Sequence, residues 1–202
     1  TKKEDLEKYV PNGTDIQFLY ARSFFRRWPI DGATRTATDF YLRRAKETWL
    51  TNGLQEQAML TLAFARLNET PTAQLILKSL GERATRSEEL GMYWKGFNSG
   101  FDWWSLPTET PALMTEAFHE VGQDKASVDA LRQYLLKLKR TTDWKTTKAT
   151  AEACYALLLT GDDWLAPKAE PVIMVGADRV KADKAESGTG YFERSWTGDE
   201  VK

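Results

Sequence analysis

Apolar residues recur every three or four positions along most of residues 14–160, and this spacing predicts a succession of helices. Some of these helices carry one narrow apolar stripe between charged faces, which is typical of half-exposed helices. They cover residues 38–51, 70–86 and 125–139. The others are rich in small apolar or aromatic residues over most of their circumference, which indicates close neighbours on several sides. They cover residues 15–27, 54–67, 111–121 and 147–159.

Half-exposed and buried helices therefore alternate along the sequence. Helical hairpins that stand side by side satisfy this order, with one member of each hairpin facing a common axis and the other facing solvent. We predict a mainly α fold in the form of a partial α/α toroid, because the predicted helices are too few to close a ring. A plain helical bundle is the alternative that periodicity leaves open.

The pattern changes after Pro167. The segment PVIMVGADRV alternates in hydropathy around a turn, and GTGYFERSW is typical of a further strand after a charged linker. We predict a helical toroid domain over residues 1–166 and, over residues 167–202, the first strands of a β domain. The sequence begins with Thr1 and not with Met, so we expect a piece of a longer protein.

Composition excludes several classes of function. The chain has 28 Lys and Arg against 29 Asp and Glu, without a long basic run, so we expect no nucleic-acid partner. No apolar run approaches the roughly 20 residues of a membrane span, and we expect no membrane contact.

Cys154, the single Cys, lies among Ala and Leu, which predicts a buried, unreactive thiol. His119, the single His, has no second ligand within helical reach, so we expect it to be exposed and to bind no metal.

The loop over residues 87–109 combines aromatic residues with the carboxylates of Glu88, Glu89, Asp102 and Glu109. In a toroid such a loop lies at one end of the barrel. Carboxylates beside stacking aromatic rings are what glycoside hydrolysis requires. A protein interface is the other interpretation, since aromatic residues concentrate at interface centres. The residues predicted to form this interface are Tyr93, Trp94, Phe97, Trp103 and Trp104.

The stretch GLQEQAML, residues 53–60, resembles the thioester motif of α2-macroglobulin and complement proteins, Gly-Cys-Gly-Glu-Gln-Asn-Met. Four of its residues match that motif: Gly53, Glu56, Gln57 and Met59. Leu54 stands in place of the Cys, and no Cys-x-Glu-Gln occurs elsewhere in the sequence. The chain therefore offers no nucleophile for covalent capture by this chemistry.

Longer segments resemble, in the same order, the late helical domain of bacterial α2-macroglobulin-like proteins. They are GLQEQAMLTLAFARLNETPTAQLILKSLGERA, GMYW, PTETPALMTEAFHEV, LKLKRTTDWKTTKATAEACYALLLTG and GTGYFERSW. The resemblance covers residues 36–200 and implies the second half of the helical thioester-type domain, followed by the start of the next β domain. In that family the thioester lies several helices upstream, so residues 53–60 are a look-alike in a different place.

The resemblance implies a fragment of a large periplasmic or cell-surface protease inhibitor, which encloses a protease after a bait segment is cut. Its partners are then neighbouring domains of the same chain and target proteases. The resemblance also implies that this piece has no catalytic, metal or cofactor site and is not an enzyme. The alternative function is a glycan-active toroid enzyme that uses the carboxylates of residues 87–109.

Overall fold

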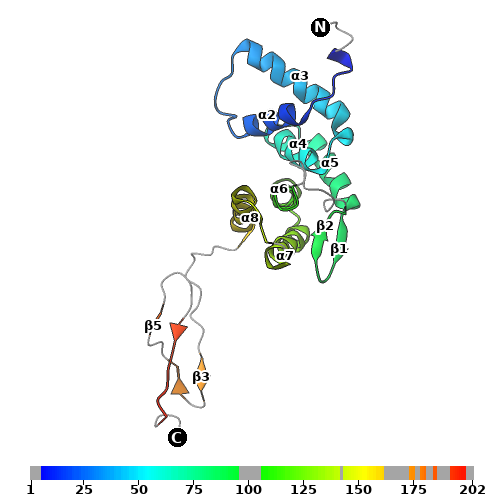
Figure 1. Cartoon of the computed structure of the whole chain (residues 1–202). Coiled ribbons are helices and arrows are strands. Elements are labelled where there is room, and N and C mark those ends of the chain that lie inside the picture. Colours follow the sequence, from blue (N-terminus) through cyan, green and yellow to red (C-terminus); the bar gives the residue numbers. More distant parts are fainter. Residues whose placement is uncertain are drawn as a thin grey trace. The chain divides into compact units, whose positions relative to one another are not determined.

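The computed structural model describes residues 6–95, 106–141, 143–161, 173–175, 178–180, 184–185 and 192–198. The chain divides into two compact units, Thr1–Gly161 and Asp162–Lys202. The first unit is built of helices and one short β hairpin, and the described elements of the second unit are short strands (Figure 1). The prediction of a mainly helical chain is therefore confirmed.

The described elements of the first unit follow one another in this order. The helices are α2 (Gly13–Ser23), α3 (Gly32–Thr48), α4 (Leu54–Arg66), α5 (Thr70–Arg83), α6 (Glu109–Ala117), α7 (Lys125–Thr141) and α8 (Thr147–Thr160). A 3-10 turn, η1 (Trp49–Thr51), follows α3, and a π-helical turn, η2 (Phe118–Gly122), continues α6. A hairpin of β1 (Thr85–Ser87) and β2 (Gly91–Tyr93) follows α5, and the sequence did not predict it.

Four helices of the first unit form one row. In this row α4 packs between α2 and α6, and α6 packs in turn against α8. These are the helices whose sequences are apolar over most of their circumference. The more amphipathic helices α3, α5 and α7 pack against α2, α4 and α6, respectively (Figure 1). The patterns of α4 and α6 agree with these neighbours, whereas α8 is packed on one side only, and α2 ends at Ser23, which leaves Phe24 and Phe25 of the predicted helix 15–27 exposed.

The main core lies along α4, which buries large and small residues together. Leu60, Leu62 and Phe64 are fully buried, and so are the alanines Ala58 and Ala63. The small side chains let neighbouring helices approach α4 closely, and each large one contributes about 1.5–3 kcal/mol on burial. A smaller core joins α7 to α8, where Trp144 is buried and donates its Nε1–H to the carbonyl of Leu135 at 3.2 Å.

Cys154 is exposed, so the prediction of a buried thiol is wrong. The reason lies in the place of α8 within the row. This helix is apolar on all sides, yet it packs against α6 and α7 on one side only. Its opposite face leaves Cys154, Tyr155 and Leu158 exposed within the described part of the chain. His119, in η2, is exposed as predicted.

The described residues of the second unit include two antiparallel strand pairs. β3 (Met174–Val175) pairs with β4 (Asp178–Arg179), and β5 (Lys184–Ala185) pairs with β6 (Phe192–Glu193). β3 and β4 lie in the segment PVIMVGADRV, and β6 lies in GTGYFERSW. Both segments that the sequence predicts to be extended therefore contain strands.

The hairpin β1–β2 depends on glycine at position 91. Gly91 has a φ of +82°, and a Cβ at this position would lie 2.1 Å from the carbonyl oxygen of Ala130 in α7. We expect Gly91→Ala to lower the free energy of unfolding by at least about 1–3 kcal/mol, measured by urea denaturation. Gly32 is the control, because a Cβ there meets nothing within 4 Å. Gly32→Ala is expected to be neutral or stabilising by up to about 1 kcal/mol, and equal losses in both variants would contradict this account.

Candidate functional site

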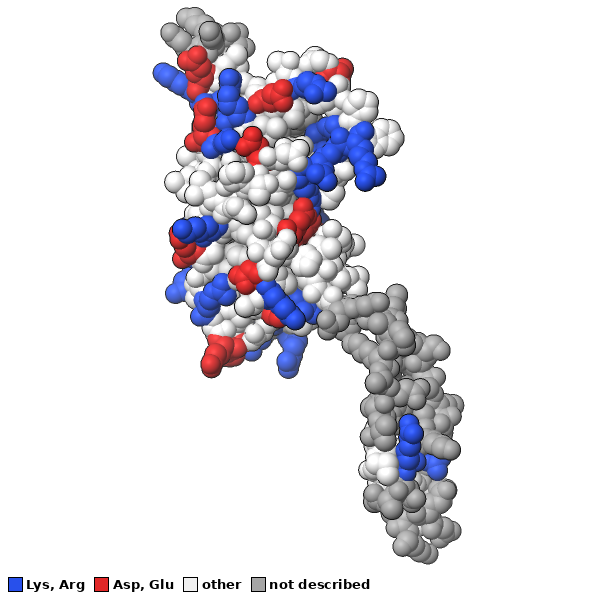
Figure 2. Space-filling model, turned by 180° about the vertical axis from the view of Figure 1, so that it is seen from behind, with Lys and Arg blue, Asp and Glu red and all other residues white. Residues whose placement is uncertain are grey.

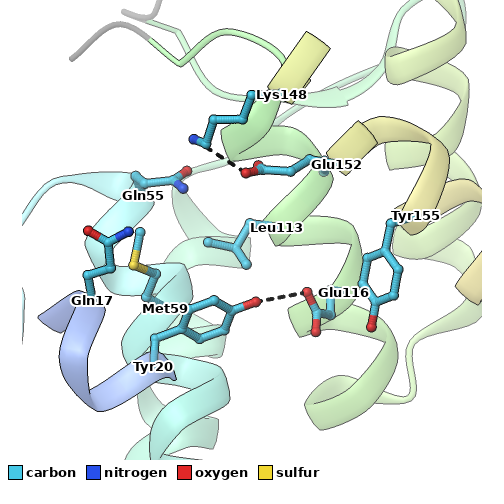
Figure 3. A pocket seen from close by; sticks show the side chains of 10 residues that line it. Gln17, Tyr20, Gln55, Met59, Leu113, Glu116, Lys148, Glu152 and Tyr155 are labelled. Carbon is cyan, nitrogen blue, oxygen red and sulfur yellow. Dashed lines mark hydrogen bonds and ion pairs between the residues drawn. The ribbon is translucent and has the colours of Figure 1, made fainter. Parts of the chain in front are cut away.

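A pocket lies between the four helices of the row, with a cavity volume of about 160 Å³ (Figure 3). Its lining consists of Gln17, Tyr20, Gln55, Met59, Ala112, Leu113, Glu116, Lys148, Glu152 and Tyr155. On each helix these residues recur at spacings of three or four, so they share the face that looks into the pocket. The pocket is thus a direct product of packing α2, α4, α6 and α8 side by side.

Two residues of the pocket lining, Tyr20 and Glu116, belong to an ion cluster around Arg66. Arg66, the last residue of α4, places Nη2 2.5 Å from Oε1 of Glu116 in α6. It also donates to both carboxylate oxygens of Glu120, from Nε at 2.9 Å and from Nη2 at 2.6 Å. Tyr20 of α2 donates its hydroxyl to the other oxygen of Glu116 at 3.3 Å. The Glu116 side chain is only 4% exposed, so three elements meet at one desolvated carboxylate.

The environment of this cluster shifts the proton affinities of its members. Burial alone lowers the pKa of Arg66, but the hydrogen bonds and charges of Glu120 and Glu116 outweigh it, and the net pKa is raised. Burial, reinforced by the charge of Glu116, raises the pKa of Tyr20 well above its usual range. Arg66 therefore stays charged and Tyr20 stays a hydrogen-bond donor at any physiological pH.

The other side of the pocket is less tightly paired. Glu152 lies 3.3 Å from Lys148, one turn earlier on α8. Burial raises the pKa of Glu152 against the opposing effect of Lys148, and the charges of Glu109 and Glu116 add to the rise. Oε1 of Gln55 is buried and has no hydrogen-bond partner within the described residues. This side therefore offers an unused acceptor and a carboxyl that holds its proton to a higher pH than usual.

Two carboxyl groups from neighbouring helices thus face one cavity in different surroundings. Glu116 is bound to a guanidinium, whereas Glu152 is half-buried beside a lysine. Such an asymmetric pair is the arrangement from which acid and base roles arise. Among the residues that the structure describes, no group of three or more His, Cys, Asp or Glu side chains is placed to hold a metal ion.

The predicted interface residues are placed differently from what the sequence suggests. Trp94 is 4% exposed and donates its Nε1–H to the carbonyl of Leu80 at 2.9 Å, so it is a core residue and offers no surface to a partner. Tyr93 is half-buried and stacks on Tyr134, with ring centroids 5.3 Å apart. The remaining three, Phe97, Trp103 and Trp104, lie outside the described residues.

Of the carboxylates predicted for glycoside hydrolysis, the three that the structure describes, Glu88, Glu89 and Glu109, do not line this pocket. Glu88 and Glu89 are exposed at the turn of the hairpin, and Glu89 lies 2.9 Å from Lys137 of α7. Glu109 is buried at the start of α6. Asp102 lies outside the described residues. The i, i+4 spacing of Lys148 and Glu152 does not by itself mark the pocket, because Lys78 and Glu82 have the same spacing at the surface.

Gln57, in the thioester look-alike, has a structural role. It is buried, its Nε2 donates to the carbonyl of Asn52 at 2.7 Å, and Arg83 of α5 donates to its Oε1. The amide thus ties α4 to α5 and to the turn before α4.

Comparison of the chain with protein-family models, with curated proteins and with solved structures found no match.

The raised pKa of Glu152 predicts a pH-dependent stability. A carboxyl whose pKa is higher in the folded state favours folding below its unfolded pKa, and this contribution is lost as pH rises through the folded pKa. The stability of Glu152→Gln relative to the native chain should therefore improve between pH ~4 and pH ~7, measured by urea denaturation. Glu82→Gln is the control, since Glu82 forms the same i, i+4 pair with Lys78 at the surface. Equal pH trends in both variants would contradict a role for burial.

Proposed function

We propose that the chain is part of the helical domain of a bacterial α2-macroglobulin-like protease inhibitor, in the periplasm or at the cell surface. The observation that carries the proposal is the order of the resembling segments together with the packing of their helices. The segment of residues 53–84 forms the packed pair α4 and α5. The segments that follow it supply α6 and then α7 with α8.

The row of helices is then an arc of an α/α toroid. Two features support further helices beside it. α8 exposes an apolar face that includes Leu158, at 64% exposure, and a helix that is apolar on all sides normally has neighbours on all sides. At the other end of the row, Phe18 of α2 is 37% exposed.

In this proposal the helical unit has a mechanical role and no catalytic one. The ion cluster around Arg66 joins α2, α4 and α6, so these three helices move as one block when the inhibitor rearranges after bait cleavage. Its partners are neighbouring domains of the same protein and, through the whole inhibitor, the target proteases.

The test uses the full-length protein that contains this chain. It is incubated with several proteases, and each protease is then assayed on a small chromogenic peptide and on a large protein substrate. Retained peptide cleavage with blocked protein cleavage is the expected result, because an enclosed protease admits only small substrates. Full activity on both substrates would contradict the proposal.

A second candidate is a glycan-active enzyme, favoured by the pairing of Glu116 and Glu152 in one cavity with two tyrosines and two amides. In this candidate the catalytic carboxylates are those of the pocket between the helices, and not those of residues 87–109 as the sequence predicts. Release of reducing ends from soluble polysaccharides by the 202-residue chain, abolished in Glu152→Gln, would support this candidate. We expect no release, because the first proposal gives this piece no catalytic role.

A further inference from the structure

The chain turns sharply after α2 and there exposes an aromatic and basic surface. Residues 24–28 form this turn, with the sequence Phe-Phe-Arg-Arg-Trp. Phe24 is 53% exposed, Phe25 57% and Trp28 70%. Arg26 and Arg27 are exposed beside them. Three large aromatic side chains in five residues are unusual for a solvated turn and mark an interaction surface.

The conformation of this turn, hereafter the aromatic turn, is fixed by side chains around it. Arg22 donates from Nη1 to the carbonyl of Phe25 and from Nη2 to the carbonyl of Trp28. Arg26 donates to the carbonyl of Arg66 at 2.9 Å. The guanidinium of Arg66 lies 4.3 Å from the ring centroid of Phe24. The aromatic rings are therefore presented to solvent by a prearranged backbone, so little ordering entropy is lost on binding.

The charged residues of the aromatic turn itself are basic, and the nearby carboxylates of Glu116 and Glu120 are paired with Arg66. Arg22, Arg26 and Arg27 lie within it or next to it, and the sequence has no acidic residue between Asp15 and Asp31. In the view of Figure 2, blue side chains also gather next to uncharged surface at one edge of the helical unit. A binding partner of this surface is therefore anionic and accepts apolar rings.

We propose that the aromatic turn binds anionic lipid headgroups at a membrane surface. Phe25 and Trp28 enter the boundary between headgroups and acyl chains, and Arg26 and Arg27 lie against the lipid phosphates and carboxylates. A lipid surface fits better than a nucleic acid, because the exposed phenylalanines have no hydrogen-bonding group and gain most from an apolar phase. The sequence-based expectation of no membrane contact rests on the lack of a membrane-spanning segment, and it does not address binding at the membrane surface. No helix in the described ranges is both long and apolar enough to cross a membrane, and surface binding requires none.

The test is sedimentation of the 202-residue chain with vesicles of phosphatidylcholine, with and without phosphatidylserine. Binding is expected only to vesicles that contain phosphatidylserine, and it should weaken with added salt. The double variant Phe25→Ala, Trp28→Ala should bind at least about ten-fold more weakly, because it loses most of the inserted apolar area. Arg27→Glu should lower binding about ten-fold or more, since the reversal changes the charge by two.

Matched controls lie elsewhere on the helical unit. Leu75 and Leu136 are 56% and 50% exposed, and their double alanine variant should bind as the native chain does. Lys78→Glu is the charge control, on the exposed face of α5. Circular dichroism confirms folding, which the exposed positions should not affect. Equal binding to both vesicle types, equal losses in the controls, or binding to a single-stranded oligonucleotide without vesicle binding would overturn the proposal.

Discussion

The buried ion pair of Arg66 and Glu116 is the interaction on which the other features of the helical unit depend. Arg66 ends α4, Glu116 lies in the middle of α6, and Tyr20 of α2 binds the same carboxylate. The pair thus fixes the relative position of three helices that share an otherwise apolar core. Glu116 also lines the pocket, and the guanidinium of Arg66 lies against the ring of Phe24 in the aromatic turn. Removing one partner of such a pair leaves a buried charge uncompensated, at a cost of about 3–5 kcal/mol.

The helices and their alternation could be predicted from the spacing of apolar residues. A helix that is buried on one side has one apolar stripe, and a helix that is buried on several sides is apolar over most of its circumference. The hairpin β1–β2 could not be predicted, because its three-residue strands are too short to show the two-residue alternation of a strand and depend on the contact of Gly91 with α7. The burial of Cys154 was predicted wrongly. The apolar pattern of α8 allows neighbouring helices on several sides, but α8 packs only against α6 and α7, and Cys154 lies outside these contacts. The pocket is lined by side chains from four helices. Helical periodicity does not determine which helices pack together, so the pocket could not be predicted from the sequence.

Aromatic residues illustrate the same limit for the candidate sites. The sequence pattern places Phe25 in a buried helix over residues 15–27 and Trp94 in an interface loop. The structure separates them, since Trp94 is buried with a hydrogen-bonded indole while Phe25 faces solvent on a fixed turn. An exposed ring on a fixed backbone is available to a binding partner, whereas a buried ring is not. The proposed inhibitor role, the pocket and the lipid surface use different faces of one helical block and can be tested separately.

The central claim is that the pair of Arg66 and Glu116 holds the row of helices together. A double-mutant cycle with Arg66→Met and Glu116→Gln measures this directly, from the free energies of unfolding of the native chain, both single variants and the double variant. The account predicts a coupling of at least about 2 kcal/mol, because each single variant leaves one buried group without its partner. Additive effects, within about 0.5 kcal/mol, would show that the helices are held by apolar packing alone and would contradict the account.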